Sequence, residues 1–135
     1  MYEGTILYRI KATRDFGDVH AGDLGGFIEK EENLSHEGDC WVAENAKVYG
    51  DAKICGNARI YDDATVSDNA TVSAYASIEG HAMVYDNAMV NGYAIIKNNV
   101  MVYDNAMVSG NGQVCGNARI NGDARIKGGL SIAVI

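Results

Sequence analysis

The sequence predicts an all-β protein, a solenoid of very short stacked strands, and three observations carry that prediction. An aliphatic residue recurs at every sixth position from Val42 to Ile132. A smaller residue, usually alanine, stands two positions before almost every one of them. The eight residues MVYDNAMV occur at positions 83–90 and return 18 residues later at positions 101–108. A six-residue unit used three times for each turn of the chain accounts for all three.

Each six-residue unit is predicted to be a short strand followed by a tight turn. A period of six does not fit a helix, and residues i and i−2 share a face only in an extended chain. The aliphatic residue and the small residue before it therefore point inward together. One variable residue and a pair rich in Gly, Asn and Asp follow, and these types tolerate the positive φ of turns. Such short strands become stable by stacking on copies of themselves.

The 18-residue return of MVYDNAMV sets the size of one coil. Three units bring the chain back to the same face, one strand spacing of about 4.8 Å higher. Residues 18 apart should therefore be stacked neighbours. One inward column is expected at Val48, Val66, Val84, Val102 and Ile120, and a ladder of Asn69, Asn87 and Asn105 at the corner that follows it.

Residues 1–38 lack the six-residue period, so we expect an N-terminal capping segment at 1–38 and a β-helix at 39–135. The stretch TILYRIKA alternates like a strand, RDFGDVHAGDLGGF has the composition of a glycine-rich loop, and IEKEEN suits a helical turn. The end of a β-helix exposes core side chains and unpaired backbone groups. The segment is expected to cover that end. The alternative is a docking surface for a partner, which the acidic stretch at 29–32 suggests. The expected plug consists of Ile6, Tyr8, Ile10, Phe27 and Ile28.

The repeats, for example VYGDA and ICGNA, resemble those of the hexapeptide-repeat proteins. This resemblance implies a left-handed parallel β-helix with a triangular section and about five coils over 39–135. The stretch from Tyr8 to Val42 is similar to the segment that precedes the repeats in YdcK-like proteins of enterobacteria and their prophages. That family carries an acyltransferase label on the strength of the repeat alone, so the resemblance implies no catalytic residues.

His81 is the one candidate for catalysis, because it is the only histidine within the regular repeat. Hexapeptide-repeat acyltransferases use a histidine as general base toward an acceptor that attacks an acyl-CoA thioester. The alternative is a solvated turn residue. The repeat runs without the protruding loop that tends to shape the acceptor pocket in those enzymes, so an active site would have to form between subunits.

The outward positions change character along the chain. They are polar near the start, as at Lys47 and Arg59, and polar again near the end, but apolar in the middle. A contiguous exposed apolar patch is unusual, and Met and Tyr are enriched at interface cores. We therefore expect a homo-oligomer, and the resemblance favours a trimer; a ligand platform and neutral drift are the alternatives. The expected interface is Met83, Tyr85, Met89, Met101, Tyr103 and Met107, with His81 and Asn99 at its rim and Tyr75 and Tyr93 stacked at a corner as a further rim or ligand site.

Composition excludes several classes of protein. The net charge of −7 argues against a nucleic-acid partner. No stretch approaches the roughly 20 apolar residues that span a bilayer, and no signal peptide opens the chain. Three cysteines without metal-ligand spacing indicate reduced thiols in a cytoplasmic protein. One histidine in the repeat cannot form a three-histidine zinc site, so no metal and no cofactor are expected.

These observations favour a non-catalytic, oligomeric β-helix that binds or scaffolds, of phage or prophage origin by resemblance. Two alternatives stay open. The first is a hexapeptide-repeat acyltransferase that uses acyl-CoA at an inter-subunit site. The second is a phage anti-defence protein that sequesters a host factor or a nucleotide. The sequence names no ligand.

Overall fold

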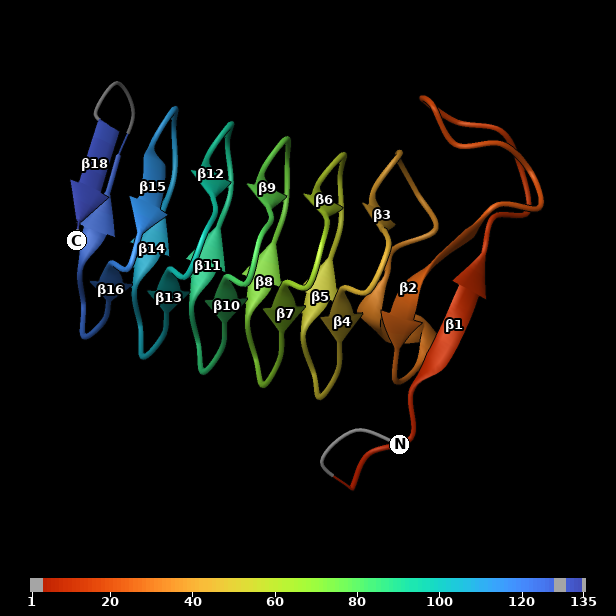
Figure 1. Cartoon of the computed structure of the whole chain (residues 1–135), viewed down its shortest axis with the longest axis horizontal. Coiled ribbons are helices and arrows are strands. Elements are labelled where there is room, and N and C mark those ends of the chain that lie inside the picture. Colours follow the sequence, from red (N-terminus) through yellow and green to blue (C-terminus); the bar gives the residue numbers. More distant parts are fainter. Residues whose placement is uncertain (1–3, 128–130, 135) are drawn as a thin grey trace.

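The computed structural model describes residues 4–127 and 131–134, which form one stack of short strands (Figure 1). The strands make three sheets, called here the first, second and third faces. The first face contains β1 (Tyr8–Lys11), β2 (Leu24–Ile28), β4 (Lys47–Val48), β7 (Thr65–Val66), β10 (Met83–Val84), β13 (Met101–Val102) and β16 (Arg119–Ile120). The second contains β5 (Lys53–Ile54), β8 (Thr71–Val72), β11 (Met89–Val90), β14 (Met107–Val108) and β17 (Arg125–Ile126). The third contains β3 (Trp41–Val42), β6 (Arg59–Ile60), β9 (Ser77–Ile78), β12 (Ile95–Ile96), β15 (Gln113–Gly116) and β18 (Ser131–Val134).

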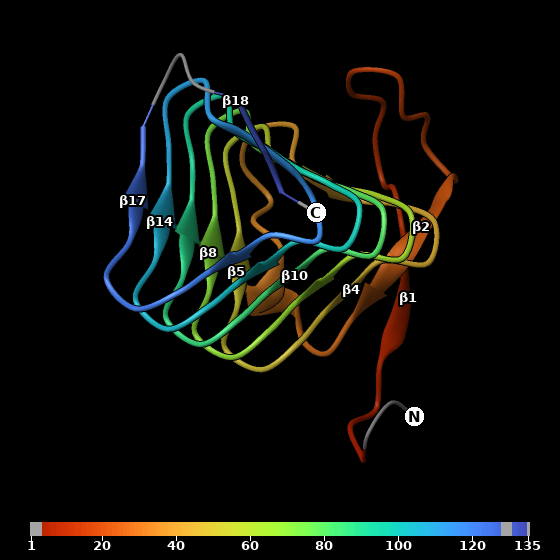
Figure 2. The same cartoon turned by 60° about the vertical axis from the view of Figure 1, so that its left-hand side comes forward.

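The register confirms a coil of 18 residues. Met83 pairs with Met101 and Val84 with Val102, in parallel, so the two copies of MVYDNAMV lie directly on each other. The backbone bonds of successive turns follow the same spacing, as where the amide of Met83 donates to the carbonyl of Val100 at 2.9 Å. Figure 2 shows the turns stacked nearly in register. The result is a parallel β-solenoid consistent with a left-handed β-helix.

The core is the continuous column of inward side chains. Val66, Val84 and Val102 are completely buried, and so are the alanines that precede such residues, for example Ala88 and Ala106. The same cluster runs from Ile28 to Ala118, with Ile120 and Ile126 packed against it. Each short strand is therefore held by the strands above and below it rather than by its own length.

The corners explain the second part of the repeat. Every sixth residue from Gly38 to Gly122 has a positive φ, and most of these residues are Gly, Asp or Asn. The left-handed region costs most L-amino acids about 1–2 kcal/mol of conformational energy. It therefore favours glycine and, through local hydrogen bonding, Asn and Asp. The corners also stack closely, because a Cβ at Gly92 would lie 2.7 Å from the amide nitrogen of Gly110.

The solenoid begins inside the segment that was expected to be only a cap. β2 pairs in parallel with β4, with Ile28 opposite Val48, and Ile28 belongs to the core. The 3-10 helix η1 (Glu31–Asn33) follows, and Leu34 then bridges to Ile54 on the second face. This first turn, residues 24–42, brings the solenoid to about six turns rather than five. Phe27 lies opposite Lys47, twenty residues along, so the irregular turn escaped a search for a strict six-residue period.

The strand β1 covers only part of the open end. It pairs antiparallel with β2 at the edge of the first face, and in Figure 1 it continues past the stack toward the N-terminus. Ile10 packs against the core and Phe27 is half-buried, but the side chains of Ile6 and Tyr8 are 58% and 60% exposed. These last two residues were expected in the plug and do not belong to it, because the start of β1 and the residues before it extend beyond the core.

The loop after β1 is fixed by a small cluster of its own. Ala12, Val19 and Trp41 are buried together, and the rings of Phe16 and Trp41 meet edge to face at 5.4 Å. The Arg59 guanidinium lies 3.1 Å from the carboxylate of Asp18, and this hydrogen bond holds the pKa of Asp18 below its usual value. The loop is therefore attached to the third face.

Candidate functional site

Four outward side chains of the first face form one surface, which we call the Met/Tyr wall: Met83, Tyr85, Met101 and Tyr103. Strands β10 and β13 place the two methionines in one column, and the residues after those strands place the two tyrosines in the next. The tyrosine rings stack with centroids 5.1 Å apart and planes 6° apart. Asn121, one turn higher, donates from Nδ2 to the Tyr103 hydroxyl at 2.8 Å. All four side chains are half-buried. Each one packs against its neighbours on one side and is accessible to solvent on the other.

Met89 and Met107 lie on the second face and not on the wall. They are paired neighbours on β11 and β14, and Met89 is 39% exposed. The corner that contains Asp86 and Asn87 separates them from Tyr85. The six predicted interface residues therefore form two patches on adjacent faces at the same height of the prism.

The residues predicted for the rim do not form one group. Tyr75 and Tyr93 stack as expected, with centroids 5.0 Å apart and planes 3° apart, and they are 54% and 60% exposed. They stand at the corner between the second and third faces. His81 and Asn99 stand at the corner between the third and first faces, just before β10 and β13. Only His81 and Asn99 border the Met/Tyr wall.

His81 has one acidic neighbour. Its Nδ1 lies 3.8 Å from Oδ2 of Asp63, one turn below, and the two side chains are 70% and 50% exposed. This separation exceeds that of a hydrogen bond, and exposed ion pairs contribute little. Among the residues that the structure describes, no hydrogen bond orients the imidazole. The arrangement is an accessible histidine beside a carboxylate.

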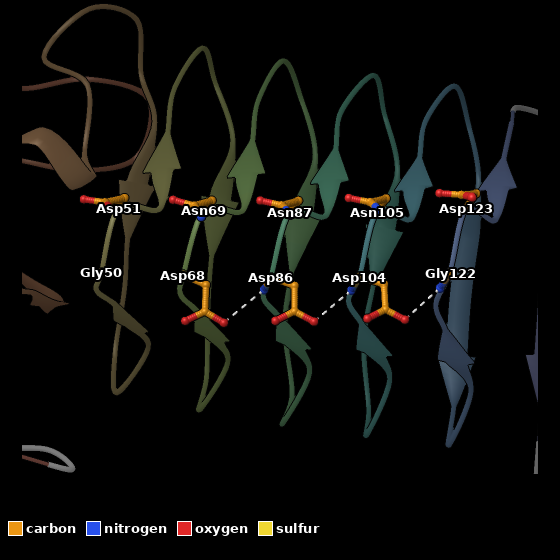
Figure 3. Close-up of a pocket in the computed structure, with 10 residues that line it drawn as sticks. All are labelled: Gly50, Asp51, Asp68, Asn69, Asp86, Asn87, Asp104, Asn105, Gly122 and Asp123. Atoms are coloured by element: carbon orange, nitrogen blue, oxygen red, sulfur yellow. Dashed lines mark hydrogen bonds between the residues drawn. The ribbon is translucent and has the colours of Figure 1, made fainter.

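A row of carboxylates at the corner between the first and second faces was missed by the sequence analysis. Figure 3 shows the expected Asn69, Asn87 and Asn105 in one row, and a second row formed by Asp68, Asp86 and Asp104. Each carboxylate in this second row accepts a bond from the backbone amide one turn above. The pairs are Asp68 with Asp86 at 3.1 Å, Asp86 with Asp104 at 3.0 Å, and Asp104 with Gly122 at 3.0 Å. The carboxylates therefore satisfy amides that the parallel ladder leaves unpaired.

The two rows line a shallow groove of about 650 Å³ that runs along the corner, with Asp51 and Asp123 at its ends. The groove is acidic, but no three His, Cys, Asp or Glu residues in the described part of the chain come together as metal ligands. Its carboxylates act as structural acceptors at the corner.

The cysteines differ in burial. Cys40 is buried in an inward position, where burial raises the pKa of its thiol to about 11. Cys55 and Cys115 are half-buried. The described residues contain no helix with the length and apolar character needed for a bilayer crossing.

Comparison with known proteins agrees with this architecture. The family model described as the YdcK β-solenoid repeat matches residues 52–67, 58–73, 82–98, 102–115 and 112–128. The chain is also similar to the "Uncharacterized acetyltransferase YdcK" of Escherichia coli (strain K12), with 43% identity over 49 residues. That match covers 36% of this chain but only 15% of the relative's length. The repeat matches, the 18-residue register and the similarity to this relative together support a YdcK-like β-helix family for the chain.

Proposed function

We propose that this protein is a non-catalytic scaffold that assembles as a homotrimer through its middle turns. The supporting observation is that the outward methionines of the described residues all lie between positions 83 and 107, beside the stacked Tyr85 and Tyr103. In the same columns, Lys47 and Thr65 lie below Met83, and Arg119 lies above Met101. Polar groups at both ends of an apolar patch match the polar rim and apolar core of an interface.

The position of the patches favours a ring over a twofold dimer. A twofold interface uses one patch twice, whereas a cyclic trimer uses two different patches on each subunit. The Met/Tyr wall and the Met89–Met107 patch lie on different faces at one height, so the wall of one protomer would pack on the second face of the next. Full burial of such a side chain stabilises by about 1.5–3 kcal/mol, and these half-buried groups would contribute less. Several must act together to exceed the cost of association.

The test is the double variant Met101→Glu and Tyr103→Glu, with molar mass measured by light scattering. The expected result is a folded protein with the mass of a monomer, because two carboxylates on the wall oppose its burial. The matched control is Ser77→Glu and Gln113→Glu, which adds the same charge to the third face and should keep the mass of the trimer. An unchanged mass in the wall variant would exclude the wall as the interface.

An acyltransferase is the second candidate, and one contact favours it. His81 borders the wall and lies 3.8 Å from Asp63, a pair that a neighbouring subunit could enclose at the rim. The name of the Escherichia coli relative points to the same activity. Thioester hydrolysis or acetyl transfer from acetyl-CoA that disappears in both His81→Ala and Asp63→Asn would favour the enzyme over the scaffold. If the protein is a non-catalytic scaffold, the unchanged protein catalyses neither reaction, and the two variants have no activity to lose.

The proposal also includes where the protein is located in the cell and where its gene comes from. An odd number of cysteines without metal-ligand spacing suits a reducing compartment, so we place the protein in the cytoplasm. The similarity of its N-terminal segment to prophage proteins supports a phage or prophage origin.

A further inference from the structure

A hollow of about 240 Å³ lies at the N-terminal end of the core, far along the stack from the Met/Tyr wall. One side is formed by β1 and the loop after it, which contribute Ile10, Ala12 and Phe16. The other side is the first turn of the solenoid, which contributes Ile28, Leu34 and Trp41. Most of the lining is therefore apolar, and it comes from two parts of the chain that only the fold brings together.

The hollow exists because the end of the core is covered unevenly. On the first face, β1 takes the place of a further turn and pairs with β2. On the second and third faces the sheets end at β5, to which Leu34 bridges, and at β3, among the residues the structure describes. Leu34 consequently stays half-buried. A second, more open hollow shares Glu31, Leu34, Ser35 and His36 with the first.

The size of the hollow limits what it can hold. An apolar cavity of about 150 Å³ accepts a benzene molecule. The larger volume here leaves room for a single ring with a short substituent. The apolar surface of Ile10, Ile28 and Trp41 suits the ring, and the open side suits a polar substituent.

The charged groups around the hollow favour an anion. The cations Lys11 and Arg14 line it, against the single carboxylate of Glu31. Arg14 is held in place, because its Nη2 donates to the carbonyl of Gly38 at 2.7 Å and its guanidinium lies 5.0 Å from the centre of the Phe16 ring. Asp39 approaches Arg14 only to 3.7 Å, which is longer than a charge-assisted hydrogen bond of about 2.7–2.9 Å. A guanidinium has five donors, so Arg14 keeps several for a ligand.

We propose that this end pocket binds a small hydrophobic carboxylate, with its ring or short chain on the apolar lining and its carboxylate toward Arg14 and Lys11. The site does not depend on the oligomer or on His81. It would make the end of the solenoid a ligand-binding element and would also complete the core there.

Three compounds with one ring test the proposal on the intact chain: 3-phenylpropionate, 3-phenylpropionamide and 3-phenylpropylamine. Binding is followed by isothermal titration calorimetry and by NMR shifts of the Trp41 indole. The acid should bind in the high micromolar to millimolar range that ligand efficiency allows for its size. The amide should bind about tenfold more weakly, and the amine not measurably. No shift of Trp41 with the acid, or equal binding of acid and amide, would overturn the proposal.

Two variants separate recognition of charge from stability of the fold. Lys11→Gln and Arg14→Gln should each weaken acid binding severalfold while leaving the amide unchanged. Arg14 also bonds to Gly38, so Lys11→Gln keeps the test valid if the loop loosens in the arginine variant. The control is Arg9→Gln, since Arg9 lies over the Phe27 ring, neither residue lines the hollow, and the change should not affect binding. Full acid affinity in folded Lys11→Gln and Arg14→Gln variants would contradict the assigned role of the two cations.

Discussion

Tyr103 lies directly over Tyr85, with ring centroids 5.1 Å apart and planes only 6° apart. The two residues are one turn apart, as are Tyr75 and Tyr93, which stack in the same way. The solenoid thus places equal residues of successive repeats in contact, on the outside as well as in the core. Burial, together with the neighbouring Tyr103, raises the pKa of the Tyr85 phenol. We therefore expect neighbouring residues of an outward column to stabilise each other.

The first prediction concerns that column. A double-mutant cycle with Tyr85→Ala and Tyr103→Ala should give a coupling of about 0.5–1.5 kcal/mol, the typical value for an aromatic pair. The cycle is measured by urea unfolding at a protein concentration where the chain is monomeric. Tyr49 and Tyr103 occupy the same column three turns apart, and their cycle should be close to zero. Equal coupling in both cycles would show that stacking is not the cause.

The second prediction compares inward and outward positions. Val84→Asp should prevent folding, because an unpaired charge in a dry core costs several kcal/mol. Met89→Asp, five residues on and facing outward, should fold with a normal circular dichroism spectrum and lose less than about 1 kcal/mol at a protein concentration where the chain is monomeric. A folded Val84→Asp variant would contradict the inward column.

Sequence periodicity predicted most of the fold, because in a solenoid each residue's neighbours lie at a fixed sequence distance. The inward column, the 18-residue coil and the Tyr75–Tyr93 stack all follow from that distance. The first turn does not obey it. β2 contains Gly25 and Gly26 where a regular unit has larger residues, and a Cβ at Gly25 would lie 2.6 Å from the Trp41 ring. The glycines allow β2 to pack closely, and the 20-residue offset between Ile28 and Val48 hides β2 from a search for a strict 18-residue return.

The candidate sites were predictable only in part, for a related reason. Alternation along a strand identifies Met83 and Tyr85 as outward residues. It does not reveal that the carboxylate of Asp86 accepts a hydrogen bond from the backbone amide of Asp104. Aspartate is common at turns, so its presence there indicates no particular hydrogen bond. The end pocket was missed because Arg14 and Leu34 lie in segments without a repeat, and only the pairing of β1 with β2 brings them together.

A third prediction concerns the corner formed by residues 56, 74 and 92. Ala74 has φ of 58° in a column that is otherwise glycine, so Ala74→Gly should stabilise the protein by up to about 1 kcal/mol. Gly92→Ala should destabilise by more than about 1 kcal/mol, because the new Cβ would lie 2.7 Å from the Gly110 nitrogen. Both are measured by urea unfolding. A gain in stability in Gly92→Ala would contradict the closely stacked corner.

A fourth prediction concerns the row of carboxylates. Asp86→Ala removes the acceptor for the Asp104 amide and places alanine at a φ of 56°. The expected loss is about 1–2 kcal/mol of unfolding free energy. Asp86→Asn keeps an acceptor oxygen and tolerates the left-handed region, so it should recover most of that loss. If Asn and Ala were equally destabilising, the charge rather than the hydrogen bond would account for the effect.

The last prediction concerns the buried thiol of Cys40. Burial raises its pKa from 9.0 to about 11 in the folded chain, so folding favours the protonated form. Below pH 9 both the folded and the unfolded chain keep the proton, and the contribution of this thiol to stability is constant. Between pH 9 and 11 the unfolded chain ionises first, so stability falls as pH rises, by on the order of 2 kcal/mol at most. Other groups titrate in the same range, so the comparison is with Cys40→Ala, whose stability should fall less between pH 8 and 10.5. A fast reaction of Cys40 with iodoacetamide in the folded protein, at the rate of the half-buried Cys55, would contradict the burial on which this argument rests.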